Sequence, residues 1–181
     1  MRFRPLEWAD FDGWAALYFS RYDELPTNPH LGLHVLERKP NLGEEAEFFG
    51  QVWKNVNAGQ QAVTVAEEAG RIVGICTIYR GTHPEDRHVG TLAVAVLPEW
   101  RGRGVGSGLL DHALRGAEGH FETVILDVIA VNERALRLYR KFGFGECGRT
   151  PRTFQRNGVY YDTVRMSKPM NPPGTNLSDR P

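Results

Sequence analysis

One segment of the chain, LAVAVLPEWRGRGVGSGLL at residues 92–110, constrains the fold more than any other. Its first residues are alternating apolar side chains, which predict a strand, and the apolar residues after Gly104 recur at helical spacing. The turn between them is rich in glycine and arginine. A helix that begins directly after such a turn leaves unpaired backbone N–H groups at its N-terminus, where the helix dipole is positive. The segment therefore predicts a site for an anion, above all a phosphate, which glycine allows to approach the backbone closely.

The spacing of the glycines excludes two common phosphate-binding loops. A P-loop ends in Gly-Lys-Ser/Thr, and no lysine occurs between Lys54 and Lys141. The dinucleotide fingerprint G-x-G-x-x-G fails in both frames, because its third glycine falls at Ser107 or at Leu109. The pattern that remains is R-x-x-G-x-G at residues 101–106. Since a predicted strand precedes it and a predicted helix follows, a binding loop is favoured over a flexible surface turn.

A second strand and a second helix follow at residues 124–144. The run VILDVIAV is typical of a strand, and NERALRLYRKFGF repeats apolar residues at i, i+3, i+4 and i+7. This spacing places them on one face of a helix. Asn132 is a suitable N-cap for that helix, and Gly143 is a suitable residue to end it.

These two segments resemble the two halves of the acetyl-CoA site in the GNAT (GCN5-related N-acetyltransferase) superfamily. R-x-x-G-x-G resembles the pyrophosphate loop, and N-x-x-A-x-x-L-Y-x-x-x-G-F at residues 132–144 resembles the rest of the cofactor site. The resemblance covers roughly residues 60–168 and, more weakly, the N-terminal strand and helices. Within the family the chain resembles the ribosomal-protein alanine N-acetyltransferases. The resemblance implies an α/β GNAT fold, a mixed and mostly antiparallel sheet of six to seven strands flanked by about four helices.

The same resemblance implies an acetyl-CoA-dependent N-acyltransferase. Acetyl-CoA would be the co-substrate, no metal is expected, and the acetyl group would pass to a primary amine by direct attack in a ternary complex. The acceptor is either the N-terminal amine of a peptide or protein, or a small-molecule amine such as an amino acid, a polyamine or an aminoglycoside. A non-catalytic acyl-CoA-binding module on the same fold is a further alternative. Such a module has usually lost the tyrosine or the glycine loop, and the presence of both in this chain counts against it. The failed glycine spacings disfavour an NAD- or nucleotide-binding protein.

The resemblance assigns the cofactor contacts to the first strand, the turn after it and the start of the second helix. Backbone N–H groups of Val94–Val96 would bond the pantetheine arm and polarise the thioester carbonyl. The pyrophosphate would rest on Gly102–Ser107, and Asn132 would touch the pantetheine or nucleotide arm, with a plain helix cap as the alternative. The predicted cofactor-binding residues are Val94, Val96, Arg101, Gly102, Arg103, Gly104, Val105, Gly106, Ser107 and Asn132.

Two side chains are candidates for proton transfer. By resemblance, the Tyr139 hydroxyl would act as the general acid for the departing thiolate, and packing in the core is the alternative role. A primary amine is largely protonated at neutral pH, so a base must accept its proton. Asp127 lies in an apolar strand where the ribosomal-protein alanine N-acetyltransferases have a glutamate. We expect it to be hydrogen-bonded beside the cofactor or to face the active site, where burial would make it a stronger base.

The assignment of the base stays open. Aspartate is one methylene shorter than glutamate, which puts direct proton transfer by Asp127 in doubt and makes a water relay plausible. A structural carboxylate is the alternative role for Asp127. Glu99, His88, His83 and ordered water are the competing bases, although a solvated loop is the simpler interpretation of His83 and the residues after it.

The acceptor wall in this family is built by the first two helices, the loop between them and the last hairpin. The acidic residues there would either neutralise a cationic amine or form a solvated helix face, and most of the aromatic residues are expected in the core. The acidic residues are Asp10, Asp12, Asp23 and Glu24, and the aromatic residues are Trp8, Trp14, Tyr18, Phe19, Tyr22, Phe154, Tyr160 and Tyr161.

Length and composition fit one domain. The 181 residues are enough for a single core, so we expect one N-acetyltransferase domain at residues 1–168 and a disordered tail at 169–181, which has little apolar area to bury. Lysine plus arginine equals aspartate plus glutamate at 22 each, which argues against bulk attraction to nucleic acid or an anionic membrane. Because the sequence has no apolar signal-like segment and no run of about 18 apolar residues, we expect a cytoplasmic protein. We expect it to be a monomer or a homodimer.

Hydrophobic periodicity also predicts the remaining elements. Both cysteines, Cys76 and Cys147, fall in strand-like stretches and are predicted to be buried in a reducing compartment. The inward face of the helix at 44–57 is predicted to hold Ala46, Phe49, Val52, Trp53 and Val56. The predicted strands are 2–6, 62–66, 71–79, 92–96, 124–131, 146–150 and 159–167, and the predicted helices are 10–22, 44–57 and those that begin after residues 104 and 132.

Overall fold

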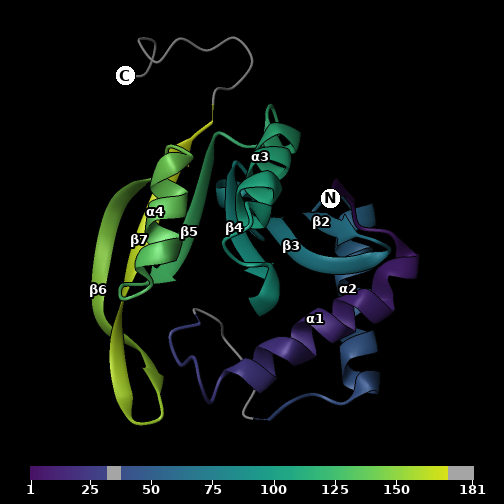
Figure 1. The fold of residues 1–181 in the computed structure, drawn as a ribbon. Coiled ribbons are helices and arrows are strands. Elements are labelled where there is room, and N and C mark those ends of the chain that lie inside the picture. Colours follow the sequence, from purple (N-terminus) through teal and green to yellow (C-terminus); the bar gives the residue numbers. More distant parts are fainter. Residues whose placement is uncertain (32–37, 171–181) are drawn as a thin grey trace.

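Seven strands and four α-helices make up the part of the chain that the computed structural model describes, residues 1–31 and 38–170 (Figure 1). The strands are β1 (Arg2–Pro5), β2 (Gln61–Glu68), β3 (Arg71–Arg80), β4 (Val89–Val96), β5 (Thr123–Ile129), β6 (Gly145–Arg156) and β7 (Val159–Pro169), and the helices are α1 (Phe11–Glu24), α2 (Leu42–Asn57), α3 (Val105–Ala117) and α4 (Glu133–Lys141). They form one sheet in the order β1-β2-β3-β4-β5-β7-β6, antiparallel throughout except for β4 and β5. The predicted order of elements and the mixed, mostly antiparallel sheet are confirmed.

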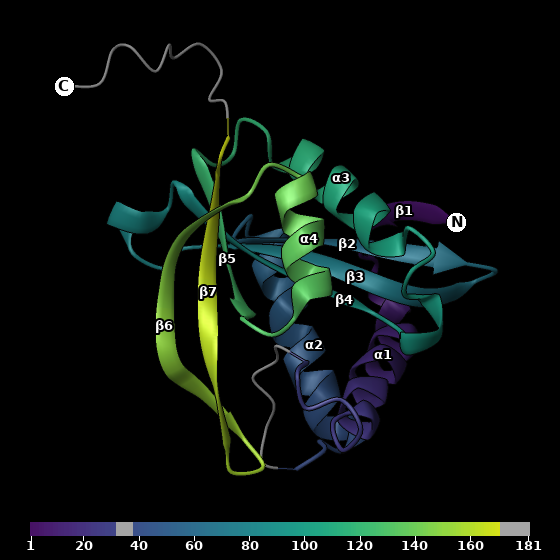
Figure 2. The ribbon, with the colours of Figure 1, turned by 60° about the vertical axis from the view of Figure 1, so that its left-hand side comes forward.

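The helices cover both faces of this sheet. Helices α3 and α4 lie on one face, and α1 and α2 lie on the other (Figure 2). The predicted inward stripe of α3 is confirmed, because Val105, Leu109, Ala113 and Ala117 are all buried. None of the helices in the described ranges is long and apolar enough to span a membrane.

The core-facing side of α2 differs from the prediction by one position. Ala46 is exposed, whereas Glu45 is only 3% exposed and accepts a hydrogen bond from the Trp14 indole N–H at 2.7 Å. Phe49 and Val52 are buried as predicted. A buried indole needs an acceptor, and the glutamate on the neighbouring helix supplies it. Apolar periodicity alone does not predict this hydrogen bond between Trp14 and Glu45.

The C-terminal hairpin of β6 and β7 is longer than predicted. Its turn contains Asn157 and Gly158, both with positive φ (50° and 75°), as a two-residue hairpin turn requires. Strand β7 continues to Pro169, and Met170 is buried and donates its N–H to the Glu122 carbonyl at 2.9 Å. Pro169 and Met170, which we assigned to a disordered tail, therefore belong to the sheet and the core. The rest of the predicted tail, residues 171–181, lies outside the described residues.

The two cysteines lie in different environments. Cys76 in β3 is fully buried as predicted, and burial raises the pKa of its thiol to about 12. Cys147 is exposed, so the prediction that it is buried was wrong. It lies in β6, an edge strand of the sheet whose residues are almost all exposed.

The parallel strands β4 and β5 separate partway along their length. They pair only from Val89 opposite Thr123 to Thr91 opposite Ile125, although both strands continue beyond these residues. Past that point, among the strands of residues 1–31 and 38–170, β4 pairs only with β3, and β5 pairs only with β7. The separation leaves backbone N–H and C=O groups without a strand partner in the middle of the sheet, where a ligand can use them.

Candidate active site

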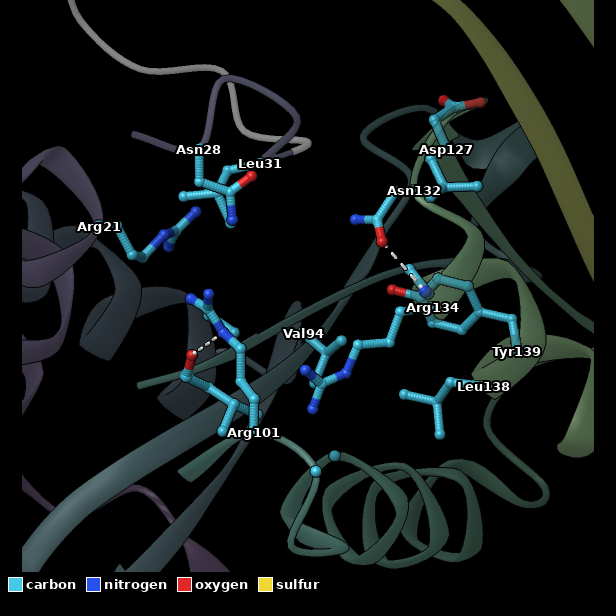
Figure 3. A pocket seen from close by; sticks show the side chains of 16 residues that line it. Arg21, Asn28, Leu31, Val94, Arg101, Asp127, Asn132, Arg134, Leu138 and Tyr139 are labelled. Atoms are coloured by element: carbon cyan, nitrogen blue, oxygen red, sulfur yellow. Dashed lines mark hydrogen bonds between the residues drawn. The ribbon is translucent and has the colours of Figure 1, made fainter. Parts of the chain in front are cut away.

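A pocket of about 250 Å³ lies where β4 and β5 separate (Figure 3). Its walls come from α1 and the segment after it, β4, the turn before α3, the first turn of α3, β5 and α4. Eight of the predicted site residues line it, namely Val94, Val96, Arg101, Gly102, Gly106, Asp127, Asn132 and Tyr139. The other lining residues are Arg21, Asn28, Leu31, Ala95, Val128, Arg134, Ala135 and Leu138. The predicted residues Arg103, Gly104, Val105 and Ser107 are not among the described lining residues.

The glycine-rich turn leaves the N-terminus of α3 open. Gly102 and Gly104 have φ values of 80° and 84°, a left-handed conformation that glycine adopts without strain. Gly104 is the N-cap of α3, so no side chain caps the first N–H groups, and the first turn contains no acidic residue. A Cβ on Gly106 would lie 3.2 Å from Leu138 of α4, which shows how closely the two helices approach. This arrangement suits an anion at the start of α3.

Arg101 is bound to protein groups on both sides. Its Nε donates to the Val96 carbonyl oxygen at 2.9 Å, and its two terminal nitrogens pair with the Glu24 carboxylate, one of them at 2.6 Å. Burial alone would raise the pKa of Glu24, but hydrogen bonds from Arg101 and Asn28 outweigh it and lower this pKa. Arg101 therefore ties the end of α1 to the end of β4 in addition to lining the pocket.

A positive charge at the turn comes from a residue that the motif leaves unspecified. Arg134 in the first turn of α4 lines the pocket, and its Nη2 lies 3.6 Å from the position that a Cβ would take on Gly102. Arg134 was not predicted as a site residue, because it occupies a variable position of the motif. Arg103, by contrast, has its guanidinium 5.3 Å from the centre of the Trp100 ring.

Two residues of α4 present polar groups to the pocket. The Asn132 side chain caps the helix, since its Oδ1 accepts the Ala135 N–H at 3.1 Å, and its amide nitrogen points into the pocket (Figure 3). Tyr139 is 6% exposed, its ring packs edge-on against Phe144, and its hydroxyl points into the pocket (Figure 3). Burial raises the pKa of Tyr139 above the ordinary value of 10.0, so the phenol keeps its proton at neutral pH.

Asp127 lies at the exposed rim of the pocket. Its side chain is 46% exposed and forms a two-point salt bridge with Arg165 of β7, with N···O distances of 2.9 and 2.7 Å. The two residues are direct cross-strand partners. The expected hydrogen bonding is confirmed, but the burial that would strengthen Asp127 as a base does not occur.

Asp127 is nevertheless the only carboxylate among the described residues that line the pocket. Glu99, a competing candidate for the base, pairs with Arg71 at 3.0 Å and does not line the pocket. His88 lines a separate hollow of the surface. Of the protein groups considered for the base, the geometry therefore brings only Asp127 to the pocket.

The residues predicted for the acceptor wall lie elsewhere. None of the aromatic ones is among the described lining residues. The expectation that most of them lie in the core was wrong, because only Trp14 of the eight is buried, with its ring stacked on Tyr18. Asp12 is also absent from the lining. The other three acidic residues form salt bridges, Asp10 with Arg4, Asp23 with Lys39 and Glu24 with Arg101. A basic residue of α1, Arg21, lines the pocket instead.

The structure has the α/β fold that the sequence motifs predicted, with a pocket where β4 and β5 separate. The open N-terminus of α3 and the buried tyrosine in this pocket are the features that the motifs predicted for an acetyltransferase. The family described as "Acetyltransferase (GNAT) family" matches residues 13–144. The chain belongs to the GNAT acetyltransferase family.

Known proteins similar to this chain include acetyltransferases of two kinds. "L-amino acid N-acetyltransferase AaaT" of Escherichia coli is 30% identical over 101 residues, and "N-alpha-acetyltransferase RimI" of Mycobacterium tuberculosis is 36% identical over 102 residues. Each alignment covers 55% of this chain and 62% of the relative, so less than two thirds of the relative is spanned. The crystal structure of a ribosomal-protein-alanine N-acetyltransferase from Brucella melitensis superimposes with a TM-score of 0.80 at 27% identity, covering 94% of this chain and 100% of that one. The predicted resemblance to this branch is thereby confirmed.

Proposed function

We propose that this chain is an N-acetyltransferase that moves the acetyl group of acetyl-CoA to a primary amine by direct attack in a ternary complex. One observation carries the proposal: the turn that opens the N-terminus of α3 and the hydroxyl of Tyr139 line the same pocket. Family membership supports the same chemistry, and the relatives are, by their names, acetyltransferases of L-amino acids or of α-amines. A non-catalytic acyl-CoA-binding module would have no use for a protonated phenol at this position.

The pocket residues suit the parts of acetyl-CoA. The uncapped N–H groups of α3, with Arg134 beside the turn, suit a diphosphate. Backbone groups of β4 that face the separation suit the amides of a pantetheine arm and the thioester carbonyl. The chain's own contribution to the reaction is to hold these groups, to place Tyr139 where a departing thiolate needs a proton, and to accept the amine proton at the Asp127 rim, directly or through water.

Thiol release tests the proposed activity directly. Purified protein is incubated with acetyl-CoA and single amines from a panel of amino acids, peptides, polyamines and aminoglycosides, and free coenzyme A is measured. We expect amine-dependent release with at least one class of acceptor. No release with any member of the panel, from a protein whose melting temperature is raised by coenzyme A, would indicate the binding module instead.

Substitutions at the two members of the Asp127–Arg165 salt bridge distinguish a role of Asp127 as a base from a structural role. Asp127→Asn removes the carboxylate, whereas Arg165→Gln removes the salt bridge and keeps the carboxylate. If Asp127 accepts the amine proton, Asp127→Asn is expected to lower turnover about tenfold or more near neutral pH, and Arg165→Gln is expected to retain most of it. Turnover is measured by thiol release across a pH series. Equal losses in the two variants would show that only the salt bridge matters.

The salt bridge between Glu24 and Arg101 gives a prediction about stability. Glu24→Gln is expected to lower the free energy of unfolding by about 1–3 kcal/mol at neutral pH, because a largely buried charged hydrogen bond is lost. Since the folded-state pKa of Glu24 is lowered, this stabilisation is present above the ordinary value of 4.5 and is lost as the pH falls through the folded-state value. Urea denaturation at neutral and at acidic pH measures the difference, which should shrink in acid.

Arg101→Gln is the matched variant for this salt bridge. If Arg101 acts only through Glu24, both variants bind coenzyme A equally well. A much weaker affinity in Arg101→Gln than in Glu24→Gln would show that Arg101 also contacts the phosphates, as the motif predicted.

A further inference from the structure

A half-buried arginine of α1 lies in the pocket wall with no carboxylate of the described residues paired to it. Arg21 projects from the last turns of α1 toward the pocket, on the side opposite Tyr139 and Asn132 (Figure 3). Its Nε is buried and has no hydrogen-bond partner among the described residues. Its guanidinium carbon lies 4.7 Å from the centre of the Tyr18 ring. The side chain is therefore held by aromatic packing and offers a free N–H donor.

The charges around Arg21 do not neutralise it. Within the described ranges, no carboxylate lies within salt-bridge distance of its guanidinium. Glu45, whose charge does act on Arg21, is buried and accepts the hydrogen bond of the Trp14 indole. Burial lowers the pKa of Arg21, with Tyr18 and Glu45 only partly opposing this effect. Because a partly desolvated guanidinium with no carboxylate in direct contact is unfavourable, the position is suited to an anion that arrives with a ligand.

The position of Arg21 distinguishes the possible sources of this anion. The diphosphate of acetyl-CoA is proposed to bind at the start of α3, and α1 lies on the opposite face of the sheet from α3 (Figure 2). Although the turn before α3 lines the same pocket, that turn already has Arg134 beside it for the diphosphate, whereas Arg21 projects from the side opposite Tyr139 (Figure 3). The anion thus belongs to the acceptor. Arginine binds carboxylates through two parallel N–H groups, which gives both affinity and orientation.

We propose that Arg21 binds the α-carboxylate of the acceptor, and that the acceptor is a free amino acid. The inference rests on the proposed acetyl transfer and names its substrate class. An amine and a carboxylate on one small molecule would engage the two sides of the pocket together, with the amine near Asp127 and Tyr139. Polyamines and aminoglycosides, which lack a carboxylate and are cationic, would be repelled by Arg21 and Arg134.

The experiment compares amino acids with their carboxamides. Each of the common L-amino acids, its carboxamide, a short peptide, spermidine and an aminoglycoside are offered with acetyl-CoA, and kcat and KM are obtained from thiol release. We expect at least one amino acid to be acetylated with a kcat/KM more than tenfold above that of its carboxamide, because one charge-assisted contact is lost in the amide. Equal use of acid and amide, or a preference for the peptide or the polyamine, would overturn the assignment of Arg21.

Variants of Arg21 complete the test. Arg21→Gln is expected to raise KM for the amino acid by about 10- to 100-fold, to abolish the preference over the carboxamide and to leave KM for acetyl-CoA unchanged. Arg21→Lys keeps the charge but loses the two-point geometry, so its KM for the amino acid should lie between those of the wild type and Arg21→Gln. Arg115→Gln, at an exposed arginine of α3 outside the pocket, is the control and should match the wild type. Retention of the acid preference in Arg21→Gln would place the carboxylate elsewhere.

A binding measurement separates failure of this inference from failure of the proposed function. The amino acids are tested for a rise in melting temperature in the presence of coenzyme A, with wild type and Arg21→Gln. If an amino acid raises the melting temperature of the wild type but not of Arg21→Gln, the carboxylate site is supported. If no thiol is released in that case, the proposed transfer reaction is overturned and the carboxylate site is not. Turnover of carboxylate-free amines, with no amino acid raising the melting temperature, supports the transferase and overturns the role of Arg21. No turnover and no rise overturn both.

Discussion

Replacing Tyr139 by phenylalanine is expected to lower turnover by at least about tenfold, and by about 100- to 10,000-fold if proton donation to the thiolate is fully lost. The phenol is buried, its raised pKa keeps it protonated at neutral pH, and its hydroxyl points into the pocket. Phenylalanine keeps the ring that packs against Phe144 and removes only the oxygen. Thiol release under conditions where chemistry limits turnover measures the effect, and thermal melting verifies that the variant is folded.

A matched substitution controls for the loss of a phenol as such. Tyr79→Phe changes a tyrosine that is 45% exposed in β3 and outside the pocket, so it should keep wild-type turnover. Acetyl-CoA affinity should be unchanged in both variants. If Tyr139→Phe transfers acetyl groups at the wild-type rate, Tyr139 is a packing residue, and the thiolate is protonated by water or another group.

Gly104→Glu is expected to reduce coenzyme A affinity by more than about 100-fold, the second large effect. Gly104 caps α3 with a φ of 84°, a conformation that strains any other residue, but a Cβ there meets nothing within 4 Å. The added side chain therefore has room and would occupy the entrance to the helix N-terminus. A carboxylate at that position competes with the phosphates for the same N–H groups and repels them. Calorimetric titration with coenzyme A measures the loss.

The control for Gly104→Glu is Gly104→Asn. Asparagine tolerates the left-handed conformation better than most residues and brings no charge. Gly104→Asn should therefore lose only part of the coenzyme A affinity that Gly104→Glu loses, while the two variants change the melting temperature by similar amounts. Wild-type affinity in the folded Gly104→Glu variant would mean that the diphosphate binds elsewhere on the protein.

The sequence predicted most reliably the features that are written in neighbouring residues. The turn before α3 and the N-cap of α4 depend on glycine and asparagine within a few positions, and both are confirmed. The inward face of α4 is confirmed in part: Tyr139 is buried, Ala135, Leu138 and Phe142 are half-buried, and Leu136, which was not predicted, is buried. Tyr139 and Asn132 were assigned to the pocket by the resemblance of their motif to the family's cofactor site, and both line the pocket. The extent of the C-terminal hairpin was underestimated, because its strands are exposed and their pairing compensates for a weak apolar pattern.

The sequence could not predict which charged residues pair across the fold. Asp127 lies 38 positions before its partner Arg165, and Glu24 lies 77 positions before Arg101. Without these partners, Asp127 resembles a buried base and Glu24 resembles part of an acceptor wall. Arg21 gave no signal in the sequence, because its importance comes from its place in the pocket wall and from a buried Nε without a partner among the described residues.

The tie between Glu24 and Arg101 bears on the order in which two substrates bind. Glu24 follows Arg21 by one turn of α1, and Arg101 begins the turn that leads into α3. A ligand that orders this turn therefore also restrains the helix that carries Arg21. Thermodynamic linkage makes such coupling reciprocal: whatever factor coenzyme A adds to the affinity for the second ligand, the second ligand adds to the affinity for coenzyme A. We expect this cooperativity to enrich the doubly occupied protein over either singly occupied form, and so to limit idle hydrolysis of the thioester.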